Sequence, residues 1–171
     1  MIRALKDKDA VRMHEWMQNT DITKKFQTDF GSFSLEKVQA FIKNAAKQTL
    51  EDANLSYAIV NDNDEYMGTI SLKNINKVDK NAEYAIVTRA DAHGKGYARI
   101  ASQEILRIAF EDLDLERVYL YVSVKNVAAN KFYQKFGFVE EGVFRKHVKI
   151  SGELTDIRWY SILKDEFLSG Q

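Results

Sequence analysis

The chain has 171 residues, 45% of them hydrophobic and 29% charged, which is the balance of a globular protein with one sizeable core. Lysine plus arginine and aspartate plus glutamate number 25 each, so the formal net charge is zero and gives no sign of a nucleic-acid partner or a membrane surface. Cysteine is absent and there are three histidines, which excludes a disulfide scaffold and a cysteine nucleophile and makes a metal site unexpected.

The first half of the chain changes from a helical to a strand-like pattern. Ile2–Leu5 has the pattern of a first strand, and Asp7 or Asp9 is expected to cap a short helix that holds Trp16. Ser34 opens a second helical pattern, whose apolar positions are Leu35, Val38, Phe41, Ile42, Ala45 and Ala46. Apolar residues then alternate on both sides of residues 61–64, Asn-Asp-Asn-Asp, which predicts a β-hairpin.

The second half alternates strands and helices. Strands are expected at Ala82–Val87 and Val118–Val124, and a helix after residues 93–98 presents Ala101, Ile105, Ile108 and Ala109 on one face. A short helix at Ala128–Phe136 ends at a glycine, and two last strands are expected near Phe138–Lys146 and Asp156–Leu163. These elements predict one α/β or α+β domain over residues 1–171, with a mixed central sheet flanked by helices. No apolar signal core precedes it and no run is long enough to cross a membrane, so a cytoplasmic protein is expected.

The loop between Ala82–Val87 and the next helix is the first candidate site. It has the sequence His93-Gly94-Lys95-Gly96-Tyr97-Ala98 and runs directly into the helical pattern. Glycines at a helix start let backbone N–H groups close on an anion, and the helix dipole favours negative charge there. The loop lacks the spacing of a P-loop, and Arg99 stands where a dinucleotide fingerprint needs its third glycine. A helix entry that needs glycine only for a tight turn remains the structural alternative.

A second motif follows the glycine loop and, together with it, indicates one protein family. Residues 126–138 include Asn126, Ala129, Phe132, Tyr133, Lys135, Gly137 and Phe138. In this order and spacing after the glycine loop, the segment resembles the GNAT superfamily of N-acetyltransferases, whose helix has the pattern Asn-x-x-Ala-x-x-Phe-Tyr-x-Lys-x-Gly-Phe. The loop matches that family at Gly96 and Ala98, although His93 stands where glutamine or arginine is usual. The resemblance runs from about Gly68 to Phe138, and the final segment, Glu141 to Asp156, is similar to the RimJ/RimL-like branch. The strand Gly68–Ile75 and the step Ala82-Glu83-Tyr84 are most similar to the spermidine N-acetyltransferases.

The resemblance implies that the anion is the pyrophosphate of acetyl-CoA, bound as a co-substrate. The expected coenzyme contacts are the loop residues His93, Gly94, Lys95, Gly96, Tyr97 and Ala98, a backbone N–H among Ile86, Val87 and Thr88 for the thioester carbonyl, and the side chains of Asn126 and Asn130. For His93 the contact is its backbone N–H. A helix cap is the alternative role for both asparagines.

Two residues are the candidate catalytic groups. Tyr133 occupies the position of the family's tyrosine, which protonates the leaving thiolate; its alternative role is that of a core aromatic beside Phe132 and Phe136. Glu83 is the candidate base that takes a proton from the acceptor ammonium through water; its alternative role is that of an exposed strand residue. Without cysteine the transfer must be direct, so both substrates are expected to bind together.

The acceptor stays open at this point. The resemblance implies a primary amine: a protein N-terminus, a polyamine or an aminosugar. The acids that could receive a cation are Asp29, Glu51, Asp52 and Glu83, whereas Asn74 stands where the spermidine enzymes have a glutamate. A non-catalytic coenzyme A-binding module and a nucleotide-binding interaction domain are the two rival functions. A homodimer is common in the family, but no patch in the sequence identifies an interface.

Overall fold

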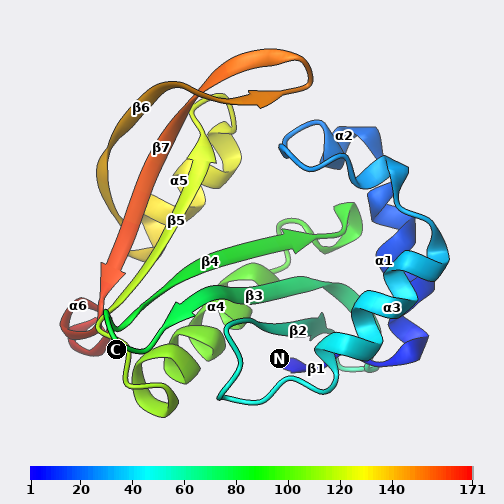
Figure 1. Cartoon of the computed structure of the whole chain (residues 1–171), viewed down its shortest axis with the longest axis horizontal. Coiled ribbons are helices and arrows are strands. Elements are labelled where there is room, and N and C mark those ends of the chain that lie inside the picture. The colour runs from blue at the N-terminus through cyan, green and yellow to red at the C-terminus, as the bar shows by residue number, and fades with distance from the viewer. Residues whose placement is uncertain (171) are drawn as a thin grey trace.

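The computed structural model describes residues 1–170, in which seven strands form one mixed sheet in the order β1-β2-β3-β4-β5-β7-β6 (Figure 1). The strands are β1 (Ile2–Ala4), β2 (Leu55–Val60), β3 (Tyr66–Asn76), β4 (Asn81–Thr88), β5 (Arg117–Ser123), β6 (Val139–Ile150) and β7 (Glu153–Leu163). The α-helices are α1 (Ala10–Met17), α2 (Thr20–Thr23), α3 (Leu35–Ala45), α4 (Tyr97–Arg107), α5 (Val127–Phe136) and α6 (Lys164–Ser169). This arrangement confirms the predicted α+β fold with a mixed central sheet.

The structure differs from the sequence prediction mainly at short or terminal elements. The helices α2 and α6 are four and six residues long, too short for a helical period to stand out, and were not predicted. The last two strands extend further than expected and meet at Ser151-Gly152, where both residues have positive φ. Asp9 does not cap α1 with its side chain; its buried carboxylate instead pairs with Arg3 and accepts the backbone N–H of Lys6.

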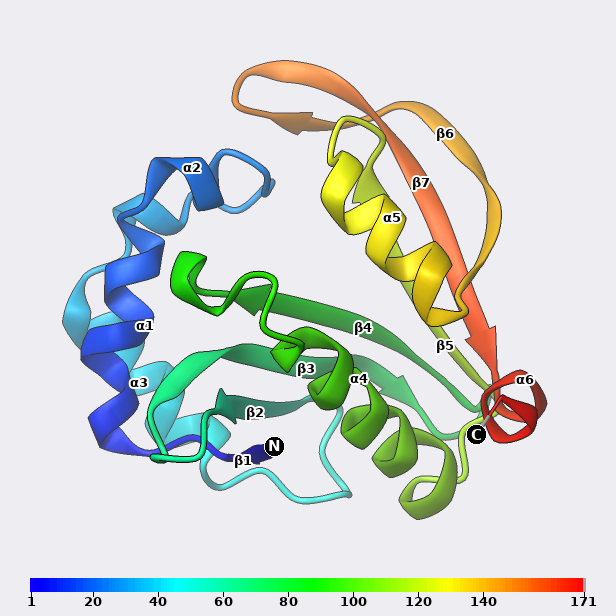
Figure 2. The ribbon, with the colours of Figure 1, turned by 180° about the vertical axis from the view of Figure 1, so that it is seen from behind.

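Two hydrophobic clusters cover the two faces of the sheet. The larger one packs α4 and α5 against β3, β4, β5 and β7, as the view from behind shows (Figure 2). The smaller one packs α1 and α3 against the other face and includes Ala58, Val60 and Tyr66. Because strand side chains alternate between faces, Tyr84 points into the larger cluster, whereas Glu83 points to the opposite face.

The parallel strands β4 and β5 pair at one end only and leave a gap in the sheet. Only Asn81, Ala82 and Glu83 of β4 are in register with β5; beyond Glu83 the two strands separate (Figure 1). Residues 84–88 stay paired with β3, so one edge of β4 lacks a strand partner within a continuous sheet. A gap of this kind exposes backbone hydrogen-bonding groups that a ligand can use.

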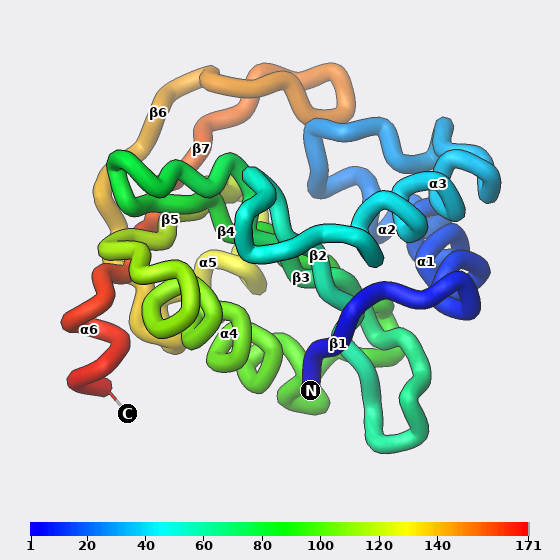
Figure 3. The backbone as a smooth tube through the Cα atoms, turned by 60° about the horizontal axis from the view of Figure 1, so that its bottom comes forward, coloured from blue at the N-terminus to red at the C-terminus, as the bar shows by residue number. Residues whose placement is uncertain are grey.

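The β6–β7 hairpin reaches across the molecule toward the segment around α2 (Figure 3). At its tip, the Ser151 hydroxyl donates a hydrogen bond of 3.3 Å to the Lys24 carbonyl oxygen, although the two residues are 127 positions apart. The tip therefore borders the same space as the N-terminal helices. None of the helices within residues 1–170 is both long and apolar enough to span a membrane.

Candidate active site

A cleft of about 860 Å³ lies at the gap between β4 and β5. Its walls come from the α1–α2 region, β3 and β4, the loop before α4, β5, α5 and the tip of the β6–β7 hairpin. This volume is in the usual range for a small-molecule site. We call the part beside the glycine loop and α5 the coenzyme half, because the sequence predicts that the coenzyme binds there. The part beside Glu83, the α1–α2 region and the hairpin tip is the acceptor half.

The loop before α4 presents five consecutive backbone donors. Within residues 1–170, no acceptor is paired with the N–H groups of residues 94–98, the last two of which begin α4. Gly94 and Gly96 have φ values of +74° and +84°, which glycine adopts without the cost that a side chain would bring. Successive N–H groups in such a turn at a helix N-terminus form an anion site, so the loop fits a pyrophosphate.

His93 differs from its predicted role. It lines the cleft, but its backbone N–H donates to the Ala90 carbonyl oxygen at 3.2 Å and is consumed by the 3₁₀ turn at Ala90–Ala92. The prediction that this N–H faces the phosphate is therefore corrected: the donors begin at Gly94. Lys95 and Tyr97 are not among the residues that line the cleft, so they can contribute through their backbone N–H groups.

The unpaired edge of β4 supplies further donors. The Arg89 N–H bonds to the Met67 carbonyl oxygen at 2.9 Å, which continues the β3–β4 register in which Gly68 faces Thr88. Because hydrogen-bonded pairs alternate in an antiparallel ladder, the N–H of Val87 then points to β3, and those of Ile86 and Thr88 point into the gap. All three residues line the cleft, but Ile86 and Thr88 have the free donors.

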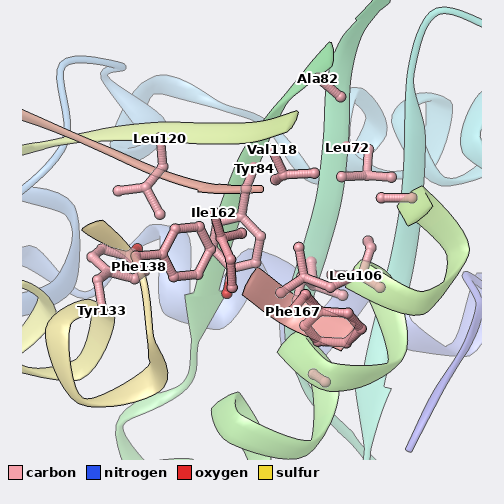
Figure 4. Packing of buried hydrophobic residues seen from close by; sticks show 14 of the residues in the cluster. Leu72, Ala82, Tyr84, Leu106, Val118, Leu120, Tyr133, Phe138, Ile162 and Phe167 are labelled. Atoms are coloured by element: carbon pink, nitrogen blue, oxygen red, sulfur yellow. The ribbon is translucent and has the colours of Figure 1, made fainter. Parts of the chain in front are cut away.

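Tyr133 lies on α5 at the other side of the gap. It is 8% exposed, lines the cleft and packs edge-on against Tyr84 with ring centroids 6.0 Å apart. Figure 4 shows it beside Phe138 and Leu120 in the larger cluster. Burial raises the pKa of Tyr133 above its usual range, because the phenolate would lose hydration in this apolar setting. The phenol is therefore protonated at neutral pH, and the same burial makes its proton harder to release.

Glu83 lines the cleft from the opposite face of the sheet. It is half-buried, in register with Tyr119 of β5 and Lys73 of β3. The pKa values of Tyr119 and Tyr121 are raised first by burial and then by the negative charge of Glu83. Tyr133 and Glu83 thus reach the gap from its two faces, with the end of the β4–β5 pairing between them.

The two predicted asparagines have different surroundings. Asn126 lines the cleft and caps α5, since its side chain accepts the Ala129 N–H at 3.3 Å. Asn130 is 5% exposed and does not line the cleft. Its amide donates to the carbonyl oxygens of Ser123 and Asn126 and accepts from Arg158 and Tyr160, so its hydrogen-bonding capacity is used inside the protein. The structure therefore makes Asn130 an internal brace rather than a coenzyme contact.

The cleft also contains residues to which the sequence analysis assigned no role in binding or catalysis. Arg99 on α4 lines the coenzyme half, with its guanidinium 5.7 Å from the ring centroid of Phe136, and Lys135 lies on the same side. Lys25 and Lys73 line the acceptor half. Of the four acids expected to bind a cationic acceptor, only Glu83 lines the cleft. Glu51 forms an ion pair with Lys77, and the Asp52 carboxylate accepts a hydrogen bond from the Thr49 backbone N–H. Asp29 precedes the 3₁₀ turn at Phe30–Ser32.

This geometry suits transfer between an anionic carrier and an amine. A row of backbone donors can hold phosphate, free N–H groups on β4 can polarise a carbonyl, and a neutral phenol stands opposite a carboxylate. An acid and a base on two faces of one opening allow two substrates to meet from opposite sides.

Comparison with known proteins gives the family. The family model for the acetyltransferase (GNAT) domain matches residues 1–139. Spermidine N(1)-acetyltransferase of Vibrio cholerae is 29% identical over 170 residues, which cover 98% of this chain and 95% of the relative. The Escherichia coli K12 enzyme of the same name is 25% identical over 98% of this chain and 88% of the relative.

The same relationship appears in three dimensions. The crystal structure of spermidine N-acetyltransferase from Vibrio cholerae in complex with CoA and spermine superposes with a TM-score of 0.87 and 26% identity, covering 98% of this chain and 97% of that one. The matched family, the glycine loop and the open β4–β5 pair agree with one another. The chain belongs to the GNAT acetyltransferase family and is an acetyl-CoA-dependent N-acetyltransferase.

Proposed function

We propose that the enzyme transfers the acetyl group directly from the thioester to a primary amine while both substrates occupy the cleft. The observation that supports this most strongly is the gap between β4 and β5, with Tyr133 on one face and Glu83 on the other. The sequence has no cysteine, so no thiol is available to carry the acetyl group between two separate half-reactions. Positioning the two reactants then accounts for much of the rate.

The coenzyme contacts follow from the free donors. The N–H groups of residues 94–98 bind the pyrophosphate, and Ile86 or Thr88 donates to the thioester carbonyl oxygen. Asn126 borders the same half as the cap of α5, and Arg99 adds a positive charge for the phosphates.

The protons are assigned to the two side chains. Glu83 takes one proton from the acceptor ammonium, directly or through water, and the neutral amine attacks the carbonyl carbon. The C–N bond forms, the C–S bond breaks, and the leaving thiolate takes the proton of Tyr133. The second proton of the amine replaces the one that Tyr133 has lost, so the products are the amide, the free thiol and one proton released from Glu83.

The charge of the acceptor half supports an acceptor with a single ammonium group. Among the described residues that line the cleft, Glu83 is the one carboxylate, and the cations Lys25 and Lys73 stand in the same half. A polyamine carries several positive charges. Lys25 and Lys73 would repel them, and Glu83 alone would attract them. We therefore infer a monoamine acceptor with a neutral or anionic body, such as a peptide N-terminus. The names of the relatives favour spermidine as the second candidate.

An assay of thiol release from acetyl-CoA separates these acceptors. The panel contains an alanine- or serine-initiated peptide with an acidic second residue, a matched peptide with a lysine there, an amino-sugar nucleotide, a simple alkylamine and spermidine. We expect the highest kcat/KM with the acidic peptide. A clear preference for spermidine would overturn the monoamine assignment and leave the direct transfer intact. Full activity in Glu83→Gln would remove Glu83 as the base.

A further inference from the structure

Asn74 in β3 has an unusual backbone conformation. Its φ is +50°, a region that few residues other than glycine occupy and in which asparagine is enriched. The residue lies inside a strand, where the β3–β4 register shifts between Lys73 and Asn76. Conformations of this kind persist where the surrounding structure fixes them, and they are concentrated at functional sites.

The conformation brings the Asn74 side chain to Glu83. Lys73 is the residue opposite Glu83 in the register, so a regular strand would point residue 74 to the other face of the sheet. The left-handed turn changes this direction, and Asn74 Nδ2 donates a hydrogen bond of 3.1 Å to Glu83 Oε2. The backbone N–H of Asn74 is held in turn by Asn54 Oδ1 at 3.2 Å.

Glu83 has no second side-chain anchor within residues 1–170. The bond from Asn74 is the one hydrogen bond to its carboxylate there, and no lysine, arginine or histidine nitrogen lies within 4.0 Å of it. Lys73, although opposite in register, forms no ion pair with it. A neutral amide fixes one carboxylate oxygen and leaves the negative charge and the other oxygen available.

We propose that Asn74 is a positioning residue that holds Glu83 Oε2, so that Oε1 faces the amine acceptor. This inference rests on the proposed role of Glu83 as the base. A glutamate side chain loses rotamer entropy when it is ordered. Because the Asn74 amide already orders Glu83 in the free enzyme, this entropy is not lost again when the acceptor binds. The positive φ of Asn74 is what places its amide donor beside the carboxylate.

Two substitutions test the contact and keep the backbone conformation accessible. Asn74→Gly allows positive φ and removes the amide; we expect kcat to fall about tenfold, with the KM for acetyl-CoA and the melting temperature nearly unchanged. Asn74→Asp keeps the shape but places a second carboxylate at Glu83, so kcat should fall further. Lys80→Gly is the matched control, because Lys80 has φ +51° in the β3–β4 turn and does not line the cleft; its kcat should equal that of the wild type.

A double-mutant cycle separates positioning from a structural role. In the Glu83→Gln background, Asn74→Gly should cause no further loss of kcat, because the group that it orients has lost its function. Equal losses in both backgrounds, or wild-type kcat in Asn74→Gly, would overturn the positioning role. If Glu83→Gln alone leaves kcat unchanged, the proposed base fails instead; if it lowers kcat while the Asn74 variants do not, only the present inference fails.

Discussion

The two halves of the cleft are built from different parts of the polypeptide. The coenzyme half takes its donors from the backbone: five consecutive N–H groups in one loop and two more on the unpaired edge of β4. The acceptor half takes its chemistry from side chains on separate elements, among them Lys25, Lys73 and Glu83. The hairpin tip closes that half from more than a hundred residues away along the chain.

This difference predicts which changes each half tolerates. A backbone donor keeps its identity under substitution, so the coenzyme half is sensitive to backbone conformation and less sensitive to the type of side chain. The acceptor half depends on the charge and shape of a few side chains, so single substitutions there should change the choice of amine. The tyrosine and the carboxylate at the gap connect the two halves.

The largest effect is expected at this connection. Tyr133→Phe keeps the ring that packs against Tyr84 and removes the proton donor, so kcat should fall by about 100- to 10,000-fold while coenzyme binding persists. Steady-state kinetics and a thermal-shift titration with acetyl-CoA measure the two quantities. Tyr160→Phe is the matched control, because its buried hydroxyl bonds to Asn130 and does not line the cleft; it should lower stability by about 1 kcal/mol and leave kcat unchanged. Wild-type kcat in Tyr133→Phe would refute the acid role.

The next effect tests whether the coenzyme half depends on backbone conformation. Gly96→Ala forces a side chain into φ +84°, which costs about 1–2 kcal/mol or shifts the N–H groups, so the KM for acetyl-CoA should rise about tenfold. The KM for the amine should stay the same. An unchanged KM for acetyl-CoA would contradict the assignment of the loop.

Gly152→Ala is the control for this strain. Gly152 also has φ +84° and open space around its Cβ position, but it lies at the tip of the β6–β7 hairpin. Its substitution should lower the melting temperature without changing the KM for acetyl-CoA. Equal effects of the two glycine variants on that KM would show that general destabilisation, rather than the anion site, is responsible.

Much of the coenzyme half could be predicted from the sequence because its information is local. Gly94 and Gly96 precede a clear helical period, and Tyr133 lies within a motif of thirteen residues. The sequence predictions that were wrong concern the hydrogen-bond partners of residues, not the location of those residues in the chain. The His93 N–H is used by the 3₁₀ turn before it, and Asn130 is saturated by partners that include β7, which no pattern in residues 126–138 could indicate.

The acceptor half could not be predicted in the same way. Lys25, Lys73 and the hairpin tip meet only when the chain folds, and no periodic pattern links them. Glu51 and Asp52 were predicted to lie there on the basis of charge alone, but they lie in a turn outside the cleft. The conformation of Asn74 depends on a register shift between two strands, which a single sequence does not specify.

An effect of similar size tests the charge of the acceptor half. Lys73→Glu places a second carboxylate beside Glu83, so kcat/KM for spermidine relative to an acidic peptide should rise about tenfold. The acetylation assay with both acceptors measures this ratio. Lys77→Glu is the control, because Lys77 follows β3 but does not line the cleft; its ratio should match the wild type. An unchanged ratio in Lys73→Glu would mean that this lysine does not face the acceptor.

The smallest effect separates side-chain charge from backbone donors within the coenzyme half. Arg99→Ala removes an exposed guanidinium near the proposed phosphate site, so the KM for acetyl-CoA should rise about two- to fivefold at low salt and approach the wild-type value at high salt. Arg107→Ala, on the same helix but outside the cleft, should leave the KM unchanged at every salt concentration. The increase in the KM for acetyl-CoA caused by Gly96→Ala should persist at high salt, because salt does not restore the direction of a displaced backbone N–H group. If instead salt abolished the Gly96→Ala effect, the loop would bind through its charge, and the contrast between a backbone-built and a side-chain-built half would fail.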